Sequence, residues 1–200
     1  MRPPINKRNL ISTSNEDPVN YYFLPIRGYF YRKRLDLVAD VLYGHKFEKL
    51  LEIGYGSGIF LPVLKDYCQA LYAVDIHQFS KEIAIRLESI GIKAELSTGD
   101  IANLPYQENF FDCIVCVSVL EHINNLDKAL NQVKRVLKKK GVFVAGFPTK
   151  SRLMKFYFQR IDRFNFKKHH PNSEKDIIEK ILQYFKIEKI RRFPAFLPME

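Results

Sequence analysis

A run of alternating glycines directly after an apolar segment constrains this chain more than any other feature. Residues 50–58 read LLEIGYGSG, so Gly54, Gly56 and Gly58 stand at alternate positions. Glycines at that spacing let the backbone turn sharply and approach a ligand closely. The turn opens onto the start of a helix, where free N–H groups face the ligand. A strand, a glycine turn and a helix in this order predict an α/β fold that binds a nucleotide-type cofactor.

Glu52 narrows the class of cofactor. A carboxylate two residues before Gly54 would repel a pyrophosphate, whereas it attracts an ammonium or a sulfonium group. The dinucleotide pattern G-x-G-x-x-G also fails here, because the last position is Ile59. We therefore expect a cationic nucleoside cofactor, and S-adenosylmethionine (SAM) is the common one. An oxidoreductase that uses a nicotinamide cofactor is a distant alternative.

Strand and helix patterns alternate from residue 48 onward, at the spacing of an α/β protein. We expect strands at residues 49–53, 70–75, 93–97, 111–119, 142–147 and 185–193, and helices at residues 58–67, 80–90, 125–139 and 173–184. The fourth strand is apolar nearly throughout, as in a central parallel strand that is covered on both faces. The pattern predicts a Rossmann-like, doubly wound and mostly parallel sheet with helices on both faces.

Charge divides the chain into three regions. Lys and Arg outnumber Asp and Glu by 9 to 5 in residues 1–50 and by 13 to 6 in residues 150–200, whereas residues 51–149 hold 10 against 11. We expect an N-terminal arm and a cleft-covering helix at 1–47, a SAM-binding core at 48–149, and a basic, aromatic lid region with the last helix and strand at 150–200. The basic excess fits an anionic partner, which could be a phosphorylated small molecule, nucleic acid or a lipid surface, and it fits a solvated basic surface equally well.

Three local patterns have simple structural interpretations. Residues 138–140 are all Lys, and we expect them in the last turn of a helix that Gly141 ends. Cys113 and Cys116 are three apart in a strand, so they face opposite sides and are expected to be buried and reduced. Residues 1–20 lack the apolar core of a signal peptide, and no apolar run is long enough to span a bilayer. We expect a cytoplasmic protein with a frayed or partner-ordered start.

Polar residues follow the predicted strands where a ligand would meet the edge of the sheet. Asp75 ends the second strand and can accept hydrogen bonds from both ribose hydroxyls. Asp100 and Ile101 follow the third strand, where they can bind an adenine amino group and cover its ring. Ser118 lies at the end of the fourth strand. Four polar strand ends in this order support the same nucleoside cofactor.

These residues and motifs resemble the class I SAM-dependent methyltransferases, and more narrowly the type 11 methyltransferase domain family, over residues 48–147. The similar segments are residues 50–58, 73–76, 99–106, 111–123 and 135–143. The resemblance implies the strand order 3-2-1-4-5-7-6, with strand 7 short or missing, because seven residues follow Phe193. It implies contacts with SAM from the following residues: Glu52, Gly54, Gly56, Asp75, Ile76, Asp100, Ile101 and Ser118. Gly58 belongs to the same loop, and Tyr55 stands where a smaller residue is usual, beside the methionine moiety.

The acceptor is less constrained than the cofactor. His122 is the candidate general base, because it follows the fourth strand, although a packed or capping histidine is the commoner role. Residues 118–122 lack the first ligand of a related metal motif, so no metal is expected. We expect a small-molecule, lipid-like or saccharide acceptor, with an anionic one favoured by the basic flanks. Methylation of nucleic acid, a non-catalytic SAM-binding module and peripheral membrane contact stay open, and the sequence does not indicate an oligomeric state.

Overall fold

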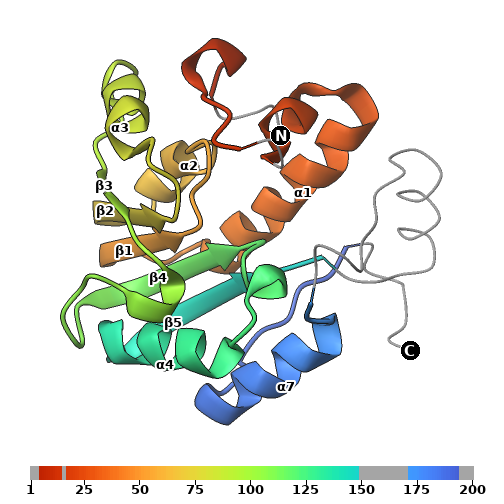
Figure 1. Cartoon of the computed structure of the whole chain (residues 1–200), viewed down its shortest axis with the longest axis vertical. Coiled ribbons are helices and arrows are strands. Elements are labelled where there is room, and N and C mark those ends of the chain that lie inside the picture. Colours follow the sequence, from red (N-terminus) through yellow and green to blue (C-terminus); the bar gives the residue numbers. More distant parts are fainter. Residues whose placement is uncertain (1–4, 15–16, 149–170, 194–200) are drawn as a thin grey trace.

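The structure is a computed structural model of the 200-residue chain that describes residues 5–14, 17–148 and 171–193. Five parallel strands form one sheet in the order β3-β2-β1-β4-β5 (Figure 1). They are β1 (Phe47–Ile53), β2 (Cys68–Asp75), β3 (Glu95–Thr98), β4 (Phe111–Val117) and β5 (Leu137–Gly146). The direction of winding reverses between β1 and β4, where α/β proteins bind ligands. The predicted fold class and the order of its first five strands are confirmed.

Helices cover both faces of the sheet. One face carries α1 (Pro25–Leu42), α2 (Leu61–Lys65) and α3 (Ser80–Glu88), and the other carries α4 (Leu126–Val136) and α7 (Glu174–Tyr184) (Figure 1). The described residues also form four short 3-10 helices. Two precede α1, namely η1 (Lys7–Asn9) and η2 (Pro18–Phe23), and two follow strands, namely η3 (Ile101–Asn103) and η4 (Leu120–His122). The described residues therefore build two apolar cores, one on each side of the sheet.

The central strand β4 separates these cores. Cys113 belongs to the core under α1 and α2, whereas Cys116 belongs to the core under α4 and α7. Both cysteines are buried and unpaired by any disulfide, and burial raises the pKa of both thiols. The expected opposite orientation of the two side chains is confirmed, and it excludes a shared disulfide.

The predicted end of the fourth helix is wrong. The helix α4 stops at Val136, and Lys138 through Gly141 lie within β5 rather than in a last helical turn. Leu137 pairs with Phe111, but Val142 pairs with Cys113, so three extra residues bulge out of β5 between the two pairs. The Lys138 ammonium lies 2.7 Å from Asp112 and 3.2 Å from Glu48. These carboxylates on β4 and β1, rather than a helix dipole, accommodate its charge.

The predicted sixth strand is also wrong. Residues 185–193 follow α7 without regular secondary structure, although their β-branched and aromatic residues favour a strand. A strand is stable only beside a neighbour that satisfies its backbone groups, and no strand of the described chain pairs with this segment. The seventh strand would fall in residues 194–200 and most of the lid in 151–170, which lie outside the described residues.

The start of the chain, expected to be a frayed or partner-ordered arm, packs on the chain's own core where it is described. Ile5, Val19 and Tyr22 are buried in or beside the core under α1. The helix α1 begins with Pro25 at its first position, which suits the fixed backbone angle of proline, and turns Leu35 and Val38 inward. In the described part of the chain, no helix is long and apolar enough to cross a membrane.

Candidate functional site

The glycine loop after β1 is held in its shape by close packing. Gly54 has a φ of +79°, and its N–H donates to the Val74 carbonyl at 2.8 Å. A Cβ at this position would lie 2.1 Å from a methyl group of Val119, so any larger residue collides with the segment after β4. Gly56 also has a positive φ, of +49°, but a Cβ there would meet no atom within 4 Å. The loop is therefore closely packed against the protein at Gly54, whereas there is free space beside Gly56.

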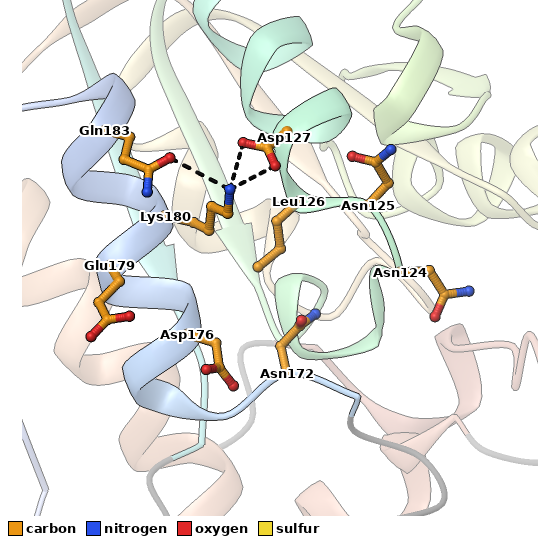
Figure 2. Close-up of a pocket in the computed structure, with 9 residues that line it drawn as sticks. All are labelled: Asn124, Asn125, Leu126, Asp127, Asn172, Asp176, Glu179, Lys180 and Gln183. Atoms are coloured by element: carbon orange, nitrogen blue, oxygen red, sulfur yellow. Dashed lines mark hydrogen bonds and ion pairs between the residues drawn. The ribbon is translucent and has the colours of Figure 1, made fainter.

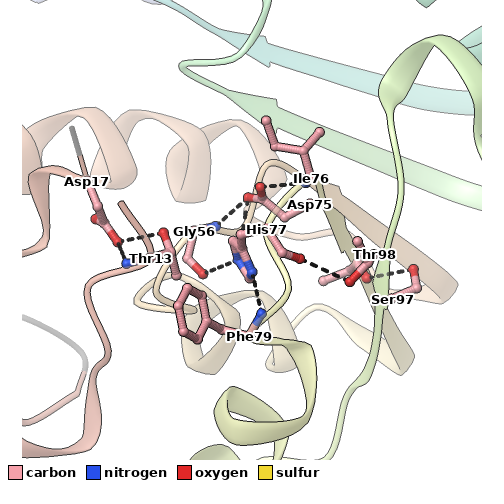
Figure 3. A network of polar contacts seen from close by, with 10 residues as sticks. Thr13, Asp17, Gly56, Asp75, Ile76, His77, Phe79, Ser97 and Thr98 are labelled. Atoms are coloured by element: carbon pink, nitrogen blue, oxygen red, sulfur yellow. Dashed lines mark hydrogen bonds and ion pairs between the residues drawn. The ribbon is translucent and has the colours of Figure 1, made fainter. Parts of the chain in front are cut away.

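Asp75 fastens the loop to the end of β2 (Figure 3). Its carboxylate accepts the Gly56 N–H at 2.8 Å and the Ile76 N–H at 2.7 Å. A carboxylate has about four acceptor sites, so two remain for other donors such as ribose hydroxyls. The predicted ribose residue is thus fixed in place by backbone groups while it keeps acceptor capacity.

His77 completes this network, and the sequence interpretation did not include it. Its Nδ1 accepts the Phe79 N–H at 3.2 Å, so its Nε2 carries the proton and donates to the Gly56 carbonyl at 3.0 Å (Figure 3). The Tyr55 ring meets the imidazole edge to face at 4.8 Å between centroids. His77 thus holds the backbone of the glycine loop at Gly56, and its position two residues after Asp75 is the signal that could have indicated it.

Glu52 is a buried carboxyl group with an unused oxygen. Only 4% of the residue is exposed, and its Oε2 has no hydrogen-bond partner among the described residues. Burial, together with the nearby charge of Asp75, raises its pKa to about 8. The buried hydroxyl of Tyr55 likewise lacks a partner in the described chain. An ammonium group from a ligand would pair with Glu52 and favour the ionised form of its carboxyl group. Glu52 and Tyr55 therefore fit the cationic methionine end of SAM.

The predicted adenine residues are placed differently from one another. Asp100 is exposed and caps η3 by accepting the Ala102 N–H at 2.8 Å. Ile101 is buried in the core under α4, whereas Ile76 is 74% exposed just after β2. Of the two isoleucines, Ile76 is therefore the one that is free to cover a ring. The assignment of the adenine contacts stays a prediction.

At the end of β4, Ser118 takes a left-handed backbone conformation with a φ of +57°, which is uncommon for a residue other than glycine. Its hydroxyl accepts a hydrogen bond from the Arg34 guanidinium, which reaches over from α1. Arg34 also donates to the Tyr22 hydroxyl at 3.0 Å and lies 5.0 Å above the Tyr31 ring. Its Nε is buried and has no partner in the described chain. A cation is thus fixed beside the end of β4.

On the short helix η4, the neighbouring residues Glu121 and His122 differ in exposure. Glu121 is 2% exposed, burial raises its pKa, and its Oε2 has no partner among the described residues. The predicted base His122 is exposed on the same helix. Asn172 fixes η4 by donating to the Leu120 carbonyl at 3.0 Å and to the Ile123 carbonyl at 2.6 Å. The fold thus directs Glu121 inward and His122 outward.

The sequence offers Arg34 only as one of three consecutive cations, and no local pattern separates it from Arg32 and Lys33. Its helical position places it on the flank of α1 that faces β4, and this position depends on how α1 packs. In the residues that the structure describes, no group of three or more His, Cys, Asp or Glu side chains is arranged to hold a metal ion.

A surface pocket of about 450 Å³ lies elsewhere, between α4 and α7 (Figure 2). Its lining is polar, and Lys180 on α7 is neutralised by Asp127 on α4 at 2.7 Å. Asn172 and Asp176, at the start of α7, form its lower wall. None of the predicted cofactor residues lines this pocket, so it is separate from the site at the strand ends.

Comparison with known proteins agrees with the geometry. Residues 51–145 match the family model described as a methyltransferase domain. A protein of Methanocaldococcus jannaschii, the uncharacterized MJ0638, is 33% identical over 106 residues, which are 53% of this chain and 43% of that protein. The sterol 4-C-methyltransferase strm-1 of Caenorhabditis elegans is 29% identical over 136 residues, or 62% of this chain and 40% of that protein.

Another relative carries the name of a different activity. The mitochondrial arginine-hydroxylase NDUFAF5 of mouse is 34% identical over 114 residues, which are 54% of this chain and 32% of that protein. This chain spans less than half the length of these three curated relatives. Among solved structures, YcgJ of Bacillus subtilis has the same fold, with a TM-score of 0.63 at 20% identity over 76% of this chain and 68% of that chain. Residues 51–145 of this chain, which contain the glycine loop, Asp75 and Ser118, thus match the methyltransferase domain family.

Proposed function

We propose that the protein is a SAM-dependent methyltransferase that acts on an anionic acceptor of the small-molecule, lipid-like or saccharide class. The unpaired, buried carboxyl group of Glu52 beside the Asp75-braced glycine loop carries the cofactor part of this proposal. Glu52 would pair with the ammonium group, and Asp75 would hold the ribose hydroxyls. SAM, when bound, supplies a methyl group that is already a good electrophile.

The protein's own task is then to hold the acceptor in line with that methyl group at near-attack distance. The order of the strand ends supports this arrangement, because Glu52 and Asp75 lie on β1 and β2, while Ser118, also an expected SAM contact, follows β4 and is held there by Arg34. Gly54 and Val119 are in direct contact, so the cofactor loop and the segment after β4 keep a fixed separation. A fixed distance between the cofactor loop and the segment after β4 supports positioning of the acceptor as the source of rate acceleration.

Arg34 supports the anionic part of the proposal. Its guanidinium is held by hydrogen bonds to Ser118 and Tyr22 and by a cation–π contact with Tyr31, and a guanidinium recognises carboxylate or phosphate groups through paired N–H donors. The sterol 4-C-methyltransferase relative makes a lipid-like acceptor a natural member of the test set. His122 stays a candidate base only for an acceptor that approaches from the exposed side of η4.

Calorimetry with SAM and with its demethylated product tests the cofactor, with Asp75→Ala as the comparison variant. We expect binding of both compounds by the wild-type protein and a loss of affinity in the variant. If neither compound binds, the proposal fails. Binding without turnover on a broad acceptor panel would favour a non-catalytic SAM-binding module.

The acceptor class is tested by transfer of a labelled methyl group to matched pairs of compounds. Each pair contains a carboxylate or phosphate and its neutral ester. We expect turnover of anionic members to exceed that of their esters by about tenfold or more, which is the scale of one charge-assisted hydrogen bond. Equal turnover of both members would contradict recognition by Arg34. Turnover on RNA or DNA that weakens steeply with salt would support a nucleic-acid methyltransferase instead.

A further inference from the structure

Large apolar side chains are exposed at the start of α1. Ile26 is 66% exposed, Tyr29 is 51% exposed, and Leu24, directly before the helix, is 41% exposed. Ile26, Tyr29 and Lys33 are spaced by three and four residues, so they share the face of α1 that points away from the buried Leu35. Isolated exposed apolar residues are common, but a cluster on one helical face indicates a binding surface.

A second segment extends this surface. Lys189 donates to the Asp40 carbonyl near the end of α1 at 3.5 Å, and the Phe193 ring meets Tyr29 near its start at 5.9 Å. Residues 189–193 therefore run alongside α1 in the opposite direction. Ile190 is 52% exposed on this segment, and Lys189 and Arg191 are also exposed. The combined surface, here called the basic–apolar face, consists of Leu24, Ile26, Tyr29, Lys33, Lys189, Ile190 and Arg191.

The charge around this face is strongly positive. Its seven members include the three cations Lys33, Lys189 and Arg191 and no Asp or Glu, whereas residues 47–148 hold 11 Lys and Arg against 12 Asp and Glu. A surface that combines exposed aliphatic side chains with cations matches the boundary between anionic lipid headgroups and acyl chains. At such a boundary the aliphatic side chains would enter the acyl region, the tyrosine would lie at headgroup level, and the cations would meet the lipid phosphates.

Two other occupants fit the same face less well. Nucleic acid would use the cations and stack on Tyr29, but it offers nothing for Leu24, Ile26 and Ile190, which can neither stack nor form hydrogen bonds. A second copy of this chain would place two basic surfaces against each other, and such like-charge contact is unfavourable. We propose that the basic–apolar face docks the protein peripherally on an anionic lipid bilayer, independently of the acceptor that it methylates.

Sedimentation with vesicles tests this proposal on the full chain. The probes are vesicles of phosphatidylcholine alone and vesicles with about one third phosphatidylserine, at low and physiological salt. We expect binding to the anionic vesicles that weakens with salt, and at least tenfold weaker binding to the neutral ones. Ile26→Asp with Ile190→Asp places one charge in each segment and should reduce binding to anionic vesicles at least tenfold. The matched control is Ile85→Asp on α3, which is 67% exposed and lies outside the face.

A charge-reversed pair gives an independent readout if the apolar variant is poorly folded. Lys33→Glu with Arg191→Glu should weaken binding at least tenfold, whereas Lys139→Glu with Lys140→Glu, exposed on the bulge of β5, should change it less than threefold. Absence of vesicle binding, or equal losses in the face and control variants, would overturn the proposal. So would RNA binding, or a dimer in sedimentation velocity, that the face variants abolish while vesicle binding persists.

Discussion

The two halves of the candidate site are built in different ways. The cofactor half, at the ends of β1 and β2, is held by backbone groups within 21 residues of one another: Asp75 accepts from Gly56, and His77 brackets the same loop. The acceptor half, at the end of β4, depends on side chains 84 residues apart, because Arg34 of α1 reaches Ser118. One half is a local motif, and the other exists only after α1 has packed.

The two halves also differ in how the polar atoms of Asp75, Arg34 and Glu121 are paired. Both oxygens of Asp75 have backbone partners, whereas Arg34 Nε and Glu121 Oε2 are buried without partners in the described chain. Buried polar atoms without partners cost free energy, so folded proteins keep few of them. In the cofactor half, Glu52 Oε2 and the Tyr55 hydroxyl are also buried without partners in the described chain. Both halves therefore keep buried polar atoms that a ligand could pair, but the cofactor half is in addition braced by hydrogen bonds from Asp75 and His77 to its backbone.

The largest expected effect comes from Gly54→Ala, which breaks the contact between the two halves. The new Cβ would lie 2.1 Å from Val119 at a φ of +79°, so clash and backbone strain act together. We expect the free energy of unfolding to fall by about 2–4 kcal/mol, with no detectable SAM binding in calorimetry. Gly44→Ala is the control, since its φ is +85° but no atom lies within 4 Å; it should cost about 1 kcal/mol and leave SAM affinity intact. If both variants lost the same stability and the same SAM affinity, backbone strain at the positive φ would explain the effect and the clash with Val119 would not.

Asp75→Asn comes next and tests the cofactor half alone. An amide oxygen can still accept the Gly56 N–H, so the loop should keep its shape, but charge-assisted hydrogen bonds to the ribose are lost. We expect SAM affinity to fall by about 10- to 100-fold in calorimetry. Asp112→Asn is the matched control, because that carboxylate pairs with Lys138 at the start of β4. A similar fall in the control would mean that both variants act through stability.

The same contrast explains what the sequence could predict. The glycine loop, Asp75 and the apolar strand β4 are local patterns, and the sheet order through β5 follows from their succession. The end of α4 was not predictable in this way, because the bulge at Lys138 depends on carboxylates from β1 and β4. Residues 185–193 have strand propensity, but propensity does not supply a neighbouring strand.

The acceptor half could not be predicted from the sequence either, because it also depends on contacts between distant segments. Three consecutive cations, Arg32, Lys33 and Arg34, take three directions around α1. Arg32 donates to the Tyr22 carbonyl, Lys33 belongs to the outward face, and Arg34 reaches Ser118. A helix turns by about 100° per residue, so the functional position is set by which face packs on the sheet. The inward orientation of Glu121 likewise depends on Asn172, about 50 residues later.

Glu52→Gln should have an intermediate effect that depends on pH. The folded-state pKa of about 8 lies above the ordinary value of 4.5, so the ligand-free protein binds the proton more tightly than the unfolded chain does. This contribution to stability is complete below pH 4.5 and is lost as pH rises toward 8. A cationic ligand prefers the ionised carboxylate, so SAM binding should release a proton at pH 6–7, and affinity should rise by up to about tenfold per pH unit.

Calorimetry in buffers of different ionisation enthalpy measures this proton release directly. The Glu52→Gln variant should release no proton through this group and should bind SAM about tenfold more weakly than the wild type near pH 8, with a smaller difference at pH 6. Thermal melts of the ligand-free variant should lose the decline between pH 5 and pH 8. Proton release that persists in the variant would assign the titration to another group.

Arg34→Met should have the smallest effect on the cofactor and thereby separates the halves most cleanly. Methionine preserves much of the apolar stem that packs along α1, while it removes the donors to Ser118 and Tyr22. SAM affinity should change by less than about threefold, because in the described chain Arg34 contacts Ser118, Tyr22 and Tyr31 rather than the glycine loop or Asp75, and Ser118 itself is kept. Turnover of anionic acceptors should approach that of their neutral esters in the same variant. Arg32→Met, two residues earlier and bonded to the Tyr22 carbonyl, should retain the anionic preference. If Arg34→Met instead weakens SAM binding as strongly as Asp75→Asn does, Arg34 belongs to the cofactor half, and the division between a local motif and a packed acceptor site is wrong.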